Sequence, residues 1–170
     1  MKLRRLEDRD AILMLEWMHD DNIVHFMRTD FSKKTLADCE AFIHLCQTDE
    51  NNVHKAIVDD DDIYMGTVSL KNIDSDKHNA EFAIVIRKDA MGKGFSKFGM
   101  DEIIRYGFGK LNLDTIYWYV NRKNQRAIRF YDKNGYHEKN LPLGENYNSS
   151  MYRWYTIQRT DTLQSWKIEN

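Results

Sequence analysis

The spacing of apolar residues near the N-terminus predicts a helix preceded by a short strand. Four apolar residues recur at positions i, i+3, i+4 and i+7, which predicts an amphipathic helix that runs to about Trp17. These residues are Ala11, Met14, Leu15 and Met18. Weak alternation over residues 2–6 predicts a first strand, and residues 19–34 lack a clear period, so a loop or a broken helix is expected there.

A second helix is predicted to begin at a capping sequence that runs from Thr35 to Asp38. Its apolar stripe is expected to comprise Leu36, Cys39, Ile43 and Cys46. The two cysteines lie seven residues apart and are therefore expected on one face of this helix, as reduced thiols in the core. Reduced cysteines indicate a cytoplasmic protein.

After residue 53 the pattern changes to strands that alternate with helices. Two strands, at 54–58 and 63–73, flank four consecutive aspartates, Asp59 to Asp62, which are expected to form a solvated turn. Residues 80–87 are nearly all apolar except Glu81, so this segment is predicted to be a central strand buried on both faces. The remaining predicted elements are a helix at 96–109 with Met100, Ile103, Ile104 and Phe108 inward, a strand at 115–120, a helix at 125–133 and strands at 136–140 and 151–158.

This order of elements predicts an α+β, or mixed α/β, fold. We expect residues 1–170 to form a single domain with one mixed, mostly antiparallel central sheet and helices on both faces. The net charge is −2, from 25 basic and 27 acidic residues, so the broad positive surface of a nucleic-acid-binding protein is not expected. The charged N-terminus is expected to be neither a signal peptide nor a membrane span.

The most informative segment is a buried strand followed by a glycine loop and a helix. The loop runs from Met91 to Ser96 with the sequence Met-Gly-Lys-Gly-Phe-Ser. Gly92 and Gly94 let a ligand approach the backbone closely, and the following helix N-terminus favours an anion such as a phosphate or pyrophosphate. The loop lacks the spacing of a Walker sequence and the third glycine of a dinucleotide fingerprint.

A second segment supplies polar side chains on one helix face. Asn124, Ala127 and Tyr131 are spaced i, i+3 and i+7, so they share a face on which the small alanine leaves a slot for a slender ligand. Together the two segments resemble the GNAT acetyltransferase superfamily, most closely over residues 80–136. The family pattern Asn-x-x-Ala-x-x-x-Tyr-x-x-x-Gly-[Phe/Tyr] is met by Asn124, Ala127, Tyr131, Gly135 and Tyr136.

The resemblance implies acetyl-CoA as co-substrate and assigns its contacts. The strand residues Ile84, Val85 and Ile86 would pair with the pantetheine arm, and the loop residues Met91, Gly92, Lys93, Gly94, Phe95 and Ser96 would wrap the pyrophosphate. Asn124 and Ala127 would line the cofactor, and Tyr131 matches the tyrosine that protonates the leaving thiolate. Two positions depart from the family, with Met91 where Gln or Arg is usual and Ser96 where Gly or Ala is usual.

Acyl transfer to an amine also needs a proton acceptor and a donor to the thioester oxygen. A backbone N–H near Val85 is the expected donor. Glu81 is the expected base because it is the one carboxylate in a nearly apolar strand, and some relatives place a Glu there to act through water. The alternative for Glu81 is a structural carboxylate paired with a cation. No metal is expected, since neither the histidines nor the aspartate run has ligand-like spacing.

The segments Leu-Glu-Trp-Met at 15–18 and Ala-Glu-Phe-Ala-Ile-Val-Ile at 80–86 resemble the GNAT branch that contains ribosomal-protein, spermidine and amino-sugar-nucleotide acetyltransferases. This resemblance implies that the acceptor is the primary amine of a small molecule, either a polyamine or a nucleotide-linked amino sugar. Trp17, Phe26, Phe31 and Tyr119 are the expected acceptor-binding residues, with His25 and Trp154 as further aromatic candidates. The alternatives are an acetyltransferase of protein N-termini, of the ribosomal-protein type, and a non-catalytic CoA-binding regulatory module. A homodimer is left open, and neither a nucleic acid nor a membrane is expected as a partner.

Overall fold

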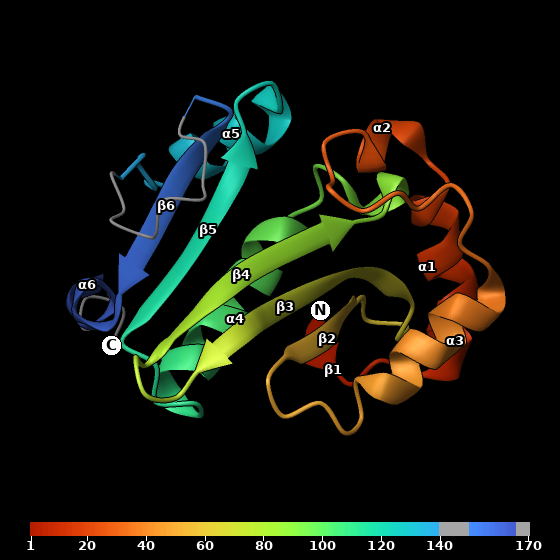
Figure 1. Cartoon of the computed structure of the whole chain (residues 1–170), viewed down its shortest axis with the longest axis horizontal. Coiled ribbons are helices and arrows are strands. Elements are labelled where there is room, and N and C mark those ends of the chain that lie inside the picture. Colours follow the sequence, from red (N-terminus) through yellow and green to blue (C-terminus); the bar gives the residue numbers. More distant parts are fainter. Residues whose placement is uncertain (140–149, 166–170) are drawn as a thin grey trace.

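The computed structural model describes residues 1–139 and 150–165. Its strands form one six-stranded sheet in the order β1-β2-β3-β4-β5-β6 (Figure 1). The strands are β1 (Lys2–Arg4), β2 (Val53–Val58), β3 (Tyr64–Asp74), β4 (Asn79–Ile86), β5 (Thr115–Asn121) and β6 (Tyr152–Gln158). The helices are α1 (Ala11–Met18), α2 (Asp21–Val24), α3 (Leu36–Leu45), α4 (Phe95–Gly109), α5 (Gln125–Lys133) and α6 (Arg159–Ser165), with 3-10 turns η1 (Asp8–Asp10) and η2 (Lys88–Ala90).

One pair of neighbouring strands departs from the antiparallel pattern. β4 and β5 run parallel and are paired only at Asn79–Thr115, Ala80–Ile116 and Glu81–Tyr117. Beyond these pairs the two strands diverge, so the sheet opens into a V between β4 and β5 (Figure 1). The other four neighbouring pairs are antiparallel, which confirms the predicted mixed, mostly antiparallel sheet.

The alternation of side chains along β2 separates two cores on opposite faces of the sheet. Ile57 belongs to the cluster that includes α4 and α5, whereas its neighbours Ala56 and Val58 belong to the cluster that includes α1 and α3. The prediction of helices on both faces is therefore confirmed. α4 lies close to the sheet at Gly99, where an added Cβ would come within 2.3 Å of the Ile57 Cδ1 atom.

α3 begins as the capping sequence predicts. The Thr35 side chain accepts a hydrogen bond from the Asp38 backbone N–H, and the Asp38 carboxylate accepts one from the Thr35 N–H at 2.8 Å. The predicted apolar stripe is wrong at Leu36, the first residue of the helix, which is 38% exposed. Cys39 is buried with its Sγ atom 3.7 Å from Met18 Sδ, Cys46 is half-buried, and both are free thiols.

Two predictions for the strands are corrected. Residues 136–139 do not form a strand, because the backbone of this segment joins β6 through the single hydrogen bond from Lys139 N–H to Trp154 O at 2.8 Å. Asn140 lies outside the described residues. β4 is not buried throughout: Ala83, Ile84 and Val85 are half-buried because β5 has already diverged from them. None of the described helices is both long enough and apolar enough to cross a membrane.

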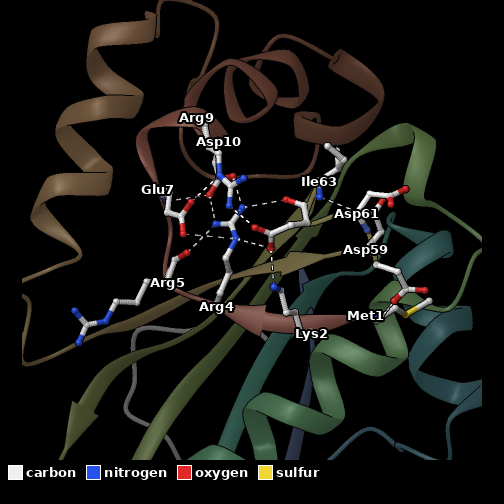
Figure 2. A network of polar contacts seen from close by, with 12 residues as sticks. Met1, Lys2, Arg4, Arg5, Glu7, Arg9, Asp10, Asp59, Asp61 and Ile63 are labelled. Atoms are coloured by element: carbon white, nitrogen blue, oxygen red, sulfur yellow. Dashed lines mark hydrogen bonds and ion pairs between the residues drawn. The ribbon is translucent and has the colours of Figure 1, made fainter.

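The four-aspartate turn between β2 and β3 is part of an ion-pair network with the N-terminal strand (Figure 2). The expected solvated turn is therefore wrong for Asp62. Arg4 donates to both oxygens of the buried Asp10 carboxylate, at 2.7 and 2.8 Å, and its Nε lies 3.1 Å from Asp62 Oδ1. Lys2 and Arg9 also pair with Asp62, and these hydrogen bonds lower the pKa of Asp62 to about 2. The network therefore fixes the β2–β3 turn against β1 and η1.

Asp62→Asn is expected to lower the melting temperature by a few degrees at neutral pH. Because the folded-state pKa of Asp62 is depressed, its contribution to stability is present above the ordinary pKa of about 4 and is lost as the pH falls through about 2. The difference from the parent protein should therefore close between pH 4 and pH 2. Asn tolerates the left-handed backbone of Asp62, where φ is 64°. Asp61→Asn is the control; an equal loss of stability in both variants would contradict a specific role of Asp62.

Candidate active site

The V between β4 and β5 contains a cleft of about 560 Å³, a size that suits a small-molecule ligand. β4 lines it over Glu81–Ile86, and β5 over Trp118–Asn121. The other walls come from the glycine loop, α5 and the segment around α2. Because β4 has no strand partner on this side after Glu81, its backbone N–H and C=O groups there are available to an extended ligand.

The glycine loop and the start of α4 form one end of the cleft. Gly92 and Gly94 have φ angles of 76° and 89°, which only glycine adopts readily, and Gly94 is the N-cap of α4. The N–H groups of the first turn of α4 have no intrahelical partner, and the N-cap, Gly94, has no side chain to cap them. This is the arrangement that binds phosphate groups.

The predicted loop residues divide into two groups. Met91, Gly92 and Ser96 line the cleft, whereas Lys93 and Gly94 are exposed beside it. Phe95 points into the core, where it is 6% exposed, so only its backbone could meet a ligand. The strand residues Ile84, Val85 and Ile86 all line the cleft.

α5 brings Asn124, Ala127 and Tyr131 to the cleft, as their spacing predicts. Asn124 is the N-cap of α5, and its Oδ1 accepts the Ala127 N–H at 3.1 Å. The cap therefore uses the carbonyl of this amide and leaves its Nδ2 for a ligand. Ala127 is half-buried and adds little bulk between Asn124 and Tyr131.

Tyr131 lies in an aromatic cluster at the inner wall of the cleft. Its ring centroid is 5.3 Å from that of Trp118 and 5.1 Å from that of Tyr155. The side chain is 6% exposed, and its hydroxyl has no hydrogen-bond partner among the described residues. Burial, followed by the nearby Tyr155 and Tyr136, raises the pKa of Tyr131 above its usual value, so the phenol remains protonated and can act as a donor.

Glu81 lies at the base of the V, in the last pair before β4 and β5 diverge. It is buried, and its carboxylate pairs with Lys71 Nζ at 2.8 Å and accepts the Asn72 Nδ2–H at 3.1 Å. The cation partner that the structural alternative requires is therefore present. Glu81 also lines the cleft, so a substrate or a bridging water can approach its carboxylate while the pair with Lys71 is kept.

Aromatic residues from α1, the segment after α2 and β5 form another part of the cleft lining. The four predicted acceptor-binding residues, Trp17, Phe26, Phe31 and Tyr119, all line the cleft. Trp17 packs edge-on against Phe31 with ring centroids 5.4 Å apart. Of the two further candidates, His25 packs against Phe26 and Trp154 packs against Tyr119, so both lie behind the lining.

Sequence reasoning did not select the polar residues of β3 that form the cleft floor. Thr67, Ser69 and Lys71 line the cleft and alternate with buried Val68 and Leu70. The period of two over this strand was a signal that could have placed all three on one face. His54 extends the floor behind Ser69, with its Nδ1 2.7 Å from Ser69 Oγ, and burial lowers the pKa of His54.

Arg126 is a further residue that sequence reasoning did not select. It extends from the first turn of α5 and lines the cleft, with its Nη1 3.1 Å from Met91 Sδ. No three His, Cys, Asp or Glu side chains are grouped to hold a metal ion in residues 1–139 and 150–165.

Comparisons with known proteins agree with this geometry. The family described as acetyltransferase (GNAT) domain matches residues 1–137. The spermidine N(1)-acetyltransferase of Escherichia coli K12 is 31% identical over 159 residues, covering 90% of this chain and 81% of its own length. The acetyltransferase PseH of Campylobacter jejuni is 28% identical over 132 residues, covering 76% of this chain and 78% of its own length.

The fold is shared with solved structures. The spermidine N-acetyltransferase from Vibrio cholerae, in complex with CoA and spermine, matches with a TM-score of 0.80 at 24% identity, over 95% of this chain and 97% of that chain. The geometry of the site and the sequence match therefore agree. The geometry comprises the opening between β4 and β5, the glycine loop and the helix with Asn124 and Tyr131. The chain belongs to the GNAT acetyltransferase family and is an acyl-CoA-dependent N-acyltransferase.

Proposed function

We propose that this protein transfers the acetyl group of acetyl-CoA directly to the primary amine of a small molecule bound in the cleft between β4 and β5. The observation that carries the proposal is the position of Tyr131, which lines the same cleft as the unpaired β4 backbone and the glycine loop. The pantetheine arm would lie along Ile84–Ile86, with the pyrophosphate at the loop Met91–Ser96.

Three proton and charge events accompany the transfer. The neutral amine attacks the thioester carbonyl, and a backbone N–H near Val85 stabilises the oxygen that becomes negative. The C–S bond then breaks, and Tyr131 protonates the departing thiolate. Burial raises the pKa of Tyr131 and would also raise the pKa of a thiol in the same cleft. Because both pKa values shift in the same direction, the phenol can still donate its proton to the thiolate.

Glu81 is proposed to receive the amine proton through a water molecule. Glu81→Gln is expected to lower turnover about tenfold at neutral pH and less at higher pH. A lysine-like amine has a pKa of roughly 10, so a rising pH supplies more neutral acceptor and replaces the lost base. The measurement is the pH–rate profile of both forms, together with their melting temperatures.

Lys71→Met distinguishes Glu81 as a base from Glu81 as a structural ion-pair partner, because it removes the cation and keeps the carboxylate. The proposal predicts a pH–rate profile for Lys71→Met that keeps the shape of the parent profile. A Glu81→Gln variant with a parallel profile and a lowered melting temperature, reproduced by Lys71→Met, would make Glu81 a structural residue.

Two classes of acceptor have separate support. The relatives from Escherichia coli and Vibrio cholerae that are named spermidine N(1)-acetyltransferase support a polyamine. The charges of the cleft favour the second candidate, a nucleotide-linked amino sugar. Glu81 is the single carboxylate among the described lining residues and is paired with Lys71, and Arg126 adds a positive charge with no carboxylate partner among the described residues. A polyamine carries several positive charges that such a lining does not balance.

Thiol release from acetyl-CoA tests the function directly. The parent protein is incubated with spermidine, spermine, a uridine-diphosphate amino sugar and a short peptide with a free N-terminus, and kcat/KM is compared. A small amine is expected to be the preferred acceptor. Preference for the peptide would indicate the protein N-terminal alternative. CoA binding without thiol release in any reaction would favour the non-catalytic module.

We also propose a cytoplasmic location and a homodimer as the form to test. The first is supported by the free thiols of Cys39 and Cys46, which burial protects by raising the pKa of each. Sedimentation of the purified protein measures the second.

A further inference from the structure

Met91 occupies the loop position where the resemblance to the family leads one to expect Gln or Arg. A thioether cannot donate a hydrogen bond to a phosphate oxygen, so the loop side chain lacks the polar contact that Gln or Arg would supply. The backbone N–H groups of the loop and of the first turn of α4 remain. The cleft is therefore short of one donor at the end where a pyrophosphate would lie.

A cation from another element lies at the same place. Arg126 belongs to the first turn of α5, on the opposite side of the cleft from the loop, and its Nη1 is 3.1 Å from Met91 Sδ. Both side chains line the cleft. The guanidinium group is thus beside the atom that replaces the expected polar group, although the two residues are 35 positions apart in the sequence.

The present partner of Arg126 is a poor one. A guanidinium group has five N–H donors, and a thioether sulfur is a weak acceptor. Within the described residues, no carboxylate pairs with Arg126, and Met91 Sδ is the acceptor that its Nη1 contacts. A charged fork of donors at the wall of a cleft, held by a weak acceptor, has the geometry that a phosphate oxygen pair satisfies.

We infer that Arg126 binds the pyrophosphate of acetyl-CoA and replaces the side-chain contact that is missing at Met91. The inference rests on the proposed function, since it assumes that acetyl-CoA occupies this cleft. The phosphates would then be held by the positive charge of Arg126 on α5 and by backbone N–H groups at the start of α4. The ligand would thus contact both sides of the V. Acetyl-CoA also carries a phosphate on its ribose, and the experiment distinguishes the two groups.

The test compares Arg126→Gln with a matched control, Arg129→Gln, by calorimetry with CoA and by the KM for acetyl-CoA. Arg129 is exposed on the same helix, three residues further on, and does not line the cleft. Arg126→Gln is expected to raise the Kd for CoA and the KM about tenfold, with kcat little changed, because one charge-assisted contact is lost. Arg129→Gln is expected to bind CoA as the parent protein does.

Two further measurements locate the contact. Dephospho-CoA lacks the ribose phosphate and keeps the pyrophosphate, so the tenfold difference between Arg126→Gln and the parent should persist with it. Met91→Gln introduced into Arg126→Gln should restore most of the lost affinity, because it returns a donor to the loop. Loss of the difference with dephospho-CoA would overturn the assignment to the pyrophosphate.

The outcomes also separate this inference from the proposed function. If the parent protein binds neither CoA nor acetyl-CoA, the proposed function fails. If the parent binds CoA and Arg126→Gln binds it equally well, only the role of Arg126 is overturned. Equal losses in Arg126→Gln and Arg129→Gln would show a general effect of charge and would also overturn it.

Discussion

Tyr131→Phe is expected to reduce kcat on the order of 10²-fold while leaving the Kd for acetyl-CoA nearly unchanged. The substitution removes a hydroxyl that has no partner among the described residues, so no hydrogen bond of the folded chain is lost. The ring keeps its contacts with Trp118 and Tyr155 at about the same centroid distances. A fall in rate therefore reports the loss of a proton donor to the thiolate and not a loss of packing.

The measurement is single-turnover thiol release at saturating acetyl-CoA, with Tyr155→Phe as the matched control. Tyr155 lies in the same aromatic cluster, and its buried hydroxyl also lacks a partner in the described part of the chain. It does not line the cleft, so its Phe variant should turn over normally. A normal rate for Tyr131→Phe would show that Tyr131 serves in packing alone.

The pH dependence of the parent enzyme supplies a second check on Tyr131. Because burial raises the pKa of this phenol, its ionisation is shifted to higher pH, and the protonated donor persists through the alkaline range. We expect no loss of kcat from phenol ionisation up to about pH 10, the ordinary pKa of tyrosine. An alkaline decrease near pH 8 that disappears in Tyr131→Phe would contradict the environment that the structure assigns to this residue.

Local patterns were sufficient to predict the elements that hold most of the site. The period of 3.6 placed Met100, Ile103 and Ile104 on the buried face of α4, and the spacing of Asn124 and Tyr131 placed both on one face of α5, which lines the cleft. These features depend on residues within one helix, so the sequence contains them directly. The family resemblance then joined the glycine loop to α5 at one site, which the lining of the cleft supports.

Features that depend on contacts between distant segments were missed. The divergence of β4 from β5 leaves Ala83 and Val85 half-buried, although the apolar run alone indicated full burial. Arg126 meets Met91 across the cleft, and Lys71 reaches Glu81 from the neighbouring strand. Strand register and helix packing determine such pairs, and neither is readable from a single segment.

Gly94→Val is expected to weaken CoA binding on the order of 10²-fold, because the N–H groups of the loop could no longer approach the charged phosphates closely. The structure also shows what the substitution costs the protein without ligand. Among the described residues, an added Cβ at Gly94 would have only Met1 Cε within 4 Å, at 3.8 Å, so there is space for it. The φ angle of 89° is unfavourable for a branched side chain, which costs about 1–3 kcal/mol of stability.

Gly135→Val separates backbone strain from ligand contact. Gly135 follows α5 with a φ angle of 80°, and no atom of the described residues lies within 4 Å of an added Cβ. The two variants should therefore lose similar stability in denaturant melts, because each places valine in the left-handed region. Gly135 does not line the cleft, so its variant should retain parent-like heats of CoA binding in calorimetry at millimolar ligand. Unchanged binding by Gly94→Val would remove the pyrophosphate from this loop, and equal loss in both variants would attribute the effect to destabilisation of the fold.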